Sequence, residues 1–185
     1  TYGYSLANSI IDAFHAGNFE QSPEPIITVH STEIELGLEN FMLALGTLLG
    51  VIDTDAKFSL MPPFVRYFSE AAFIKIGDAS ITGIPGELYP EIAVGGIENP
   101  EGADYEIVPQ EVPYLRSQYS GKLNLMVNLA NDSIGYIIPK SEWDNEAPWN
   151  YGETEETYGE VVSLGPNTAP KIHENIIKLI EESKN

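Results

Sequence analysis

The stretch "PPFVRYFSEAAFIKIGDASITGIPGE" (residues 62–87) does most to determine the fold. Apolar and β-branched residues predict two strands, one over about residues 65–76 and one over about 79–84. The Gly77-Asp78 pair between them is a turn signal. The stretch therefore predicts a β-hairpin.

Helical and strand patterns surround this hairpin. They predict helices over residues 5–16, 38–50, 87–94 and 170–182, strands over 25–36 and 122–130, and a long connection over 97–120. The second helix and the strand 122–130 are apolar enough to be predicted as buried. Helices interleaved with strands indicate an α/β fold, a layered domain with a mixed β-sheet flanked by helices. We expect residues 1–185 to be a single domain or part-domain.

The overall composition limits the classes of partner. In 185 residues there are 28 Asp and Glu against nine Lys and Arg, which gives a net charge of -19. Such a chain repels phosphate backbones and anionic lipids, so nucleic acid is not an expected partner. No apolar run reaches the ~18 residues of a membrane span, so no transmembrane segment is expected. Cysteine is absent, which excludes thiolate metal ligands.

The amino terminus raises a separate possibility. The chain begins at Thr1 without an initiator Met, so we expect a fragment or a processed piece of a longer product. An amino-terminal threonine can act as a nucleophile with its own amine as base in self-processing hydrolases. Thr1 leads directly into a predicted helix instead of opening a strand. An arbitrary fragment boundary at Thr1 is therefore a simpler interpretation than a catalytic threonine.

Two polar turns are the best candidates for a site. In open α/β sheets, ligands bind beyond the carboxyl ends of the strands. Glu87 follows the strand 79–84, and Tyr136 follows the strand 122–130 after a polar turn that begins at Asn131. If the strands are neighbours, the carboxylate and the phenol converge. Both are hard oxygen donors, although a metal can hold tyrosine only as phenolate, far below its usual pKa near ~10.

Other interpretations of these residues stay open. Glu87 at a helix start is favoured by the helix dipole, and Tyr136 can be a packed tyrosine at a strand end. The histidines His15, His30 and His173 show neither HxxxH nor HxH spacing, so each is expected to be an ordinary surface or core imidazole. Further metal ligands would have to come from elsewhere.

Residues 142–160 form an acidic and aromatic segment. It carries seven acidic residues and no basic one, together with two Trp and two Tyr. One interpretation is a solvated acidic loop; the other is a cover over a site, with a cation bound. Trp143, Trp149 and Tyr151 are the candidate substrate-covering side chains.

Three motifs in a fixed order carry a family resemblance. They are "IPGE" (84–87), "LANDSIGYIIP" (129–139) and "ETYGEVVSLGPNTAPKI" (156–172). Their order and spacing resemble the final third of the catalytic domain of the neutral/alkaline ceramidases and their bacterial relatives. That family comprises zinc-dependent amidases that hydrolyse the N-acyl bond of ceramide. The resemblance implies the carboxy-terminal portion of a larger catalytic domain, and a secreted or periplasmic location.

The resemblance also assigns residues. It implies one zinc ion held by Glu87 and Tyr136, with two histidine ligands from an upstream segment of the same precursor that this chain lacks. The remaining matching motif residues are Pro85, Gly86, Asn131, Gly165 and Pro166. The family's G-P-H-T segment is similar to "GPNT" here, with Asn167 in place of the histidine.

The chain departs from the family where substrate is concerned. Ceramidases follow the P-G-E motif with a Thr-rich turn and an Arg pair, whereas this chain reads "LYPEIAVGG". The resemblance is therefore compatible with a true ceramidase and equally with a shorter bacterial or archaeal relative that acts on another amide or lipid. The expected function is hydrolysis of an N-acyl amide bond, and the alternative is a non-catalytic binding or structural domain that keeps the fold.

Overall fold

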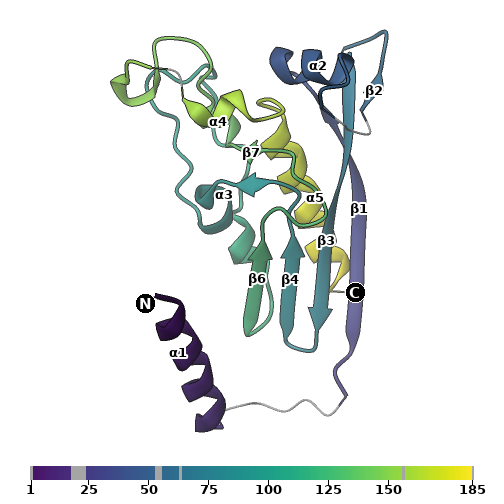
Figure 1. Ribbon diagram of the computed structural model, residues 1–185, viewed down its shortest axis with the longest axis vertical. Helices are drawn as coiled ribbons and strands as arrows, with labels where there is room; N and C mark the ends of the chain where they lie inside the picture. The colour runs from purple at the N-terminus through teal and green to yellow at the C-terminus, as the bar shows by residue number, and fades with distance from the viewer. Residues whose placement is uncertain (1, 18–23, 53–55, 63, 156, 185) are drawn as a thin grey trace.

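The computed structural model describes residues 2–17, 24–52, 56–62, 64–155 and 157–184 (Figure 1). In chain order the elements are α1 (Tyr2–Ala16), β1 (Ile27–Gly37), α2 (Phe41–Leu48), β2 (Lys57–Phe58), β3 (Val65–Ile76), β4 (Ala79–Gly83), β5 (Glu87–Leu88), α3 (Pro90–Val94), η1 (Leu115–Gln118), β6 (Leu123–Val127), β7 (Tyr136–Ile137), η2 (Lys140–Glu142), η3 (Asn150–Gly152), α4 (Tyr158–Val161) and α5 (Thr168–Glu182). The η elements are short 3-10 helices. Thr1, the alternative nucleophile, lies outside the described residues.

The main sheet is mixed, with strand order β1-β3-β4-β6 and β2 paired to β3. β1 and β4 are both antiparallel to β3, while β6 is parallel to β4. β3 and β4 form the predicted hairpin, and Gly77 turns it with a φ of 58°. The predicted α/β layered fold with a mixed sheet and flanking helices is confirmed.

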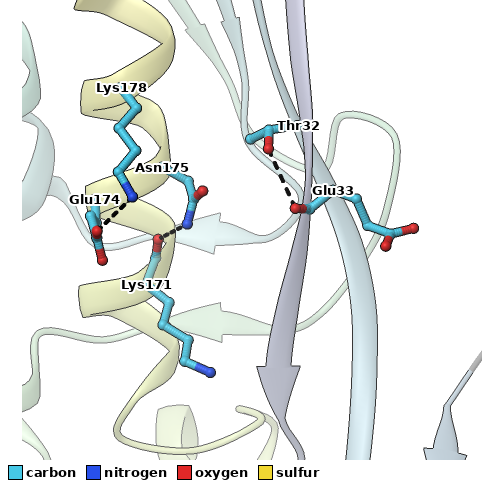
Figure 2. Close-up of polar contacts among 6 residues, drawn as sticks. All are labelled: Thr32, Glu33, Lys171, Glu174, Asn175 and Lys178. Atoms are coloured by element: carbon cyan, nitrogen blue, oxygen red, sulfur yellow. Dashed lines mark hydrogen bonds and ion pairs between the residues drawn. The ribbon is translucent and has the colours of Figure 1, made fainter.

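Helix α5 covers one face of this sheet (Figure 1). Its buried side chains include Ile172, Ile176 and Leu179, which join the core that Ile34 and Leu36 of β1 also form. The opposite side of α5 is polar, and Figure 2 shows Lys178 donating to Glu174 one turn away, 2.6 Å between Nζ and Oε1. The amphipathic closing helix is thus confirmed, starting two residues earlier than predicted.

The other face of the sheet carries partly exposed apolar side chains at the end near the β3–β4 turn. One row of paired residues crosses β1, β3, β4 and β6 through Val29, Ile74, Ile81 and Leu125. At its two ends Val29 is 63% exposed and Leu125 is 46% exposed. The prediction of a buried strand over 122–130 was wrong, because β6 lies at the edge of the sheet and turns its leucines to this uncovered face.

Two helices also differ from their predicted environment. Helix α1 forms as predicted, but none of its side chains, among those that the structure describes, is buried. Helix α2 likewise contains no buried residue in the described chain, so the prediction of a largely buried helix was wrong. Asn40 caps α2 by accepting hydrogen bonds from the amides of Met42 and Leu43. A membrane-spanning helix is not found within the described ranges.

A second, two-stranded sheet of β5 and β7 corrects the prediction for Glu87. Glu87 opens a short strand, and helix α3 begins only at Pro90. The helix-dipole interpretation of Glu87 is therefore wrong. The backbone of Glu87 is instead held by a main-chain hydrogen bond, 2.9 Å from its N to the oxygen of Gly135.

The long connection 97–120 is anchored to the core at two points. His173, buried in α5, places its Nε2 2.8 Å from the carbonyl oxygen of Pro113. Further along, Tyr119 stacks on Phe73 with ring centroids 6.0 Å apart, and its hydroxyl lies 2.7 Å from the hydroxyl of the buried Thr82. The connection is thus packed against the main sheet.

The Tyr119 contact predicts a pH-dependent stability. Burial, as the largest cause, raises the pKa of the Tyr119 phenol above 10.0. A phenol whose pKa is raised on folding stabilises the fold fully below its unfolded pKa and loses that contribution as the pH rises through the folded value. We expect Tyr119→Phe to lower the unfolding free energy by about 1 kcal/mol at pH 7, because Thr82 loses its partner.

The difference in unfolding free energy between the wild type and Tyr119→Phe should shrink as the pH rises above 10. Only the wild type has a phenol at this position that ionises, so only the wild type then loses stability there. Urea unfolding at pH 7 and pH 11 measures it, with Tyr4→Phe as the control, because Tyr4 is 76% exposed. A deficit that is the same at both pH values would contradict the prediction.

Candidate functional site

Main-chain hydrogen bonds join the two motif turns. The amide of Ala130 donates to the oxygen of Ile84 at 2.9 Å, and the amide of Ile134 donates to the oxygen of Pro85 at 3.0 Å. These bonds continue the parallel pairing of β4 and β6 past the ends of both strands. The "IPGE" and "LANDSIGYIIP" stretches are therefore one structural unit, although they are distant in the sequence.

Within this unit Glu87 and Tyr136 are direct partners across β5 and β7. Each is preceded by a glycine that has no room for a side chain. A Cβ on Gly86 would lie 2.8 Å from Cγ1 of Ile134, and a Cβ on Gly135, where φ is 85°, would overlap the carbonyl oxygen of Val162. Glycine at both positions lets the two strands come together, which aligns the carboxylate with the phenol.

The electrostatics of the pair favour a neutral phenol. The negative charge of Glu87, followed by burial and by a hydrogen bond to the same carboxylate, raises the pKa of Tyr136 above 10.0. Both side chains are only partly buried, so neither lies in dry packing. The pair is thus accessible to a ligand or a cation that can replace the phenolic proton.

Two further tyrosines enclose Tyr136. The rings of Tyr89 and Tyr158 each lie 6.0 Å from the Tyr136 ring and meet it edge to face, at 77° and 75°. Such edge-to-face contacts hold an aromatic ring in one orientation. Tyr136 therefore has little freedom to turn away from Glu87.

A cavity of about 510 Å³ opens beside the pair. Its polar lining includes Glu87, Tyr136, Tyr158 and Asp132. Its apolar lining consists of Leu38, Leu43, Ile52, Ile134, Val162 and Leu164. Polar groups at one side of an apolar cavity are typical of a site for an amphiphilic small molecule.

Asp132 has a structural role at this cavity. Its carboxylate accepts hydrogen bonds from the hydroxyls of Tyr67 and Ser69, at 3.1 and 2.8 Å, and from the amide of Ser133 at 2.7 Å. These contacts tie the polar turn to β3. Asp132 thus positions the turn that carries Tyr136.

The other motif residues shape the backbone around the pair. Pro85 is buried at the end of β4, and Asn131 takes a positive φ of 72° in the polar turn. Gly165 and Pro166 are buried ahead of α5, where a Cβ on Gly165 would come within 2.7 Å of the Cβ of Glu39. Asn167 donates from its side-chain amide to Glu39 at 2.9 Å.

The proposed aromatic cover lies elsewhere. Trp143 is buried and lines a second, acidic cavity. Tyr151 is 69% exposed and donates to Glu98 at 2.7 Å. The described residues that line the cavity at Glu87 and Tyr136 do not include Trp143, Trp149 or Tyr151. The aromatic side chain of the acidic segment that does line it is Tyr158.

The histidines do not meet the pair. His30 lies on β1, 3.9 Å from Glu182, and His173 contacts Pro113. His15 lies in the last turn of the exposed helix α1. Within the residues that the structure describes, no group of three His, Cys, Asp or Glu side chains is arranged to hold a metal ion. The described residues thus bring no imidazole to Glu87 and Tyr136.

Sequence reasoning missed Tyr89, Tyr158 and Asp132. Tyr89 stands two residues after Glu87, the spacing that returns a strand side chain to the same face, so a strand prediction here would have found it. Tyr158 and Asp132 reach the cavity through tertiary contacts alone. The sequence matches no protein-family model and no curated protein, and the structure matches no solved structure.

Proposed function

We propose that this chain supplies part of the zinc site of a metal-dependent hydrolase that cleaves an N-acyl amide bond, as in ceramidases. The observation that carries the proposal is the pairing of Glu87 with Tyr136 across β5 and β7, beside a cavity with an apolar wall. The residues in question are those to which the family motifs assign zinc ligation.

The chemistry of the donor pair fits zinc in part. A carboxylate and a phenolate are both accepted by zinc, and the phenolic proton is the one that a cation would replace. Zinc sites in proteins use three or four protein ligands, and the described residues provide two. The proposal therefore includes two imidazoles from an upstream segment of the same precursor.

The chain's own residues would bind and orient the substrate. When bound, zinc would polarise the acyl carbonyl and make water nucleophilic near neutral pH. Glu87 and Tyr136 would hold the cation, and Tyr89 and Tyr158 would fix the ring of Tyr136 in place. Asp132 keeps the polar turn against β3, so the donor geometry is set before any ligand binds.

The cavity favours a linear N-acyl substrate. Its six aliphatic side chains form a wall suited to an acyl chain, while its polar side lies at Glu87 and Tyr136. The cavity lining contains no basic side chain among the described residues, so recognition of an anionic substrate is not expected. The substrate class is thus a neutral or cationic lipid-like amide.

Zinc content tests the split site. We expect the isolated chain to bind zinc weakly, because two oxygen donors leave the ion with too few protein ligands. Mixing the chain with a polypeptide that covers the segment upstream of it in the precursor should raise bound zinc to one ion per complex, as measured by metal analysis after dialysis. Tight, stoichiometric zinc on the isolated chain would refute the shared site.

A non-catalytic binding domain is the second candidate. The cavity could seat an amphiphile without hydrolysing it, since the described residues bring no imidazole to the pair. A complex that binds an N-acyl amide but releases no fatty acid with zinc present would favour this candidate.

A further inference from the structure

The acidic segment 142–160 borders a second cavity, of about 960 Å³. Six carboxylates line it, from Glu39, Glu101, Asp104, Glu106, Glu146 and Glu160, and the described lining residues include no Lys, Arg or His. A cavity of one charge sign concentrates ions of the opposite sign. The cavity thus offers an entry path for a cation.

Three buried side chains with oxygen donors lie together next to this cavity. Glu160 lines it, whereas Asp144 and Asn150 lie behind the lining and are joined to Glu160 by hydrogen bonds. Asp144, Asn150 and Glu160 are 0%, 7% and 3% exposed. The Asp144 carboxylate accepts a hydrogen bond from the amide of Asn150 through Oδ2 at 2.9 Å. The amide of Asp144 in turn donates to Oε1 of Glu160 at 3.2 Å. These bonds connect the three residues into one cluster.

Two oxygens of this cluster have no partner. Oδ1 of Asp144 and Oδ1 of Asn150 are both inaccessible to solvent, and neither accepts a hydrogen bond from any described residue. A buried acceptor without a donor is costly, and native structures satisfy nearly all of them. One of these oxygens belongs to a carboxylate and the other to a neutral amide. The large number of acidic residues in the segment therefore does not explain why both oxygens lack a hydrogen-bond donor. The pair indicates a missing electropositive partner.

Among the residues that the structure describes, no basic side chain pairs with either oxygen. Residues 142–160 contain no Lys or Arg, and the nearby Lys140 directs its Nζ to Oδ1 of Asn167 at 2.8 Å. Burial is the largest cause that raises the pKa values of Asp144 and Glu160, and their mutual repulsion adds to that of Glu160. Both carboxylates would therefore be stabilised by a bound cation.

We propose that Asp144, Asn150 and Glu160 form a binding site for a hard divalent cation, calcium, which enters through the acidic cavity. Calcium accepts carboxylate, amide and main-chain oxygens together with water, in flexible geometry. Zinc and the other imidazole-seeking metals are disfavoured, because every donor here is oxygen. The site is separate from the Glu87 and Tyr136 pair and does not depend on the proposed hydrolase function.

Terbium luminescence on the full chain tests this site directly. Tb³⁺ replaces Ca²⁺ in oxygen sites and is excited through a nearby tryptophan, and Trp143 and Trp149 are the sequence neighbours of Asp144 and Asn150. We expect sensitised emission that saturates at one Tb³⁺ per chain and is displaced by Ca²⁺. Asp144→Asn and Glu160→Gln should each weaken Ca²⁺ binding by about tenfold or more, because each removes a ligand charge.

Glu153→Gln is the matched control. Glu153 lies in the same segment and is exposed. The substitution Glu153→Gln therefore removes the same amount of negative charge without removing a proposed ligand. We expect less than about a twofold change in Ca²⁺ affinity, since exposed charges are well screened. Equal weakening in Asp144→Asn and Glu153→Gln would overturn the proposal in favour of a diffuse ion atmosphere.

The wild-type chain gives a result that does not depend on the folding of any variant. Emission that rises without saturation, or that Ca²⁺ does not displace, would also overturn the proposal. Circular dichroism identifies a variant that does not fold, in which case the wild-type stoichiometry and the other variant decide.

Discussion

Glu87→Gln and Tyr136→Phe should each lower zinc affinity by about 100-fold or more in the proposed complex of this chain with an upstream segment, and the proposed hydrolysis of N-acyl amides should be lost with the metal. Glutamine keeps the shape of Glu87 but not its charge, and phenylalanine keeps the ring of Tyr136 but not its oxygen. Because the two residues pair across β5 and β7, removing either donor leaves the other without its partner. Isothermal titration with zinc and release of fatty acid from an N-acyl amide measure the two effects.

The structure offers a matched control for this result. Tyr151 donates to Glu98 at 2.7 Å, which repeats the tyrosine-to-glutamate contact outside the candidate site. Tyr151→Phe and Glu98→Gln should therefore leave zinc affinity and hydrolysis within about twofold of wild type, as exposed substitutions usually do. Unchanged hydrolysis in Glu87→Gln or Tyr136→Phe would instead favour a structural role for the pair.

Gly135→Ala should destabilise the chain by more than about 3 kcal/mol, from overpacking added to an unfavourable backbone angle. Gly135 has a φ of 85°, and an added Cβ would overlap the carbonyl oxygen of Val162. The neighbouring contact is main chain, since Gly135 forms a bridge to Ser163, so no side chain can rotate away. Urea unfolding followed by circular dichroism measures the loss.

Gly50→Ala separates the backbone strain from the steric overlap. Gly50 has a φ of 68°, but a Cβ built there meets no atom of the described residues within 4 Å. We expect it to cost only about 1 kcal/mol, the strain of the left-handed region alone. Equal losses in the two variants would show that the contact with Val162 contributes nothing.

Local sequence patterns predicted the main helices and strands well, but they predicted less well which of these would be buried. The β3–β4 hairpin followed from the Gly77-Asp78 turn signal, and α5 from its amphipathic spacing, because both signals act between residues close in sequence. The burial of α2 and of the strand 122–130 was predicted wrongly. An apolar side chain shows only that burial would be favourable, and whether a layer covers it depends on the rest of the fold.

The same division holds for the candidate site. The sequence alone placed Glu87 and Tyr136 at the ends of two strands, since turn residues mark those ends locally. Only the tertiary structure showed that β4 and β6 are neighbours, that Glu87 lies in a strand and not at a helix start, and that Tyr158 and Asp132 share the cavity. Strand order and cavity lining depend on contacts between residues far apart in the chain, which no local pattern specifies.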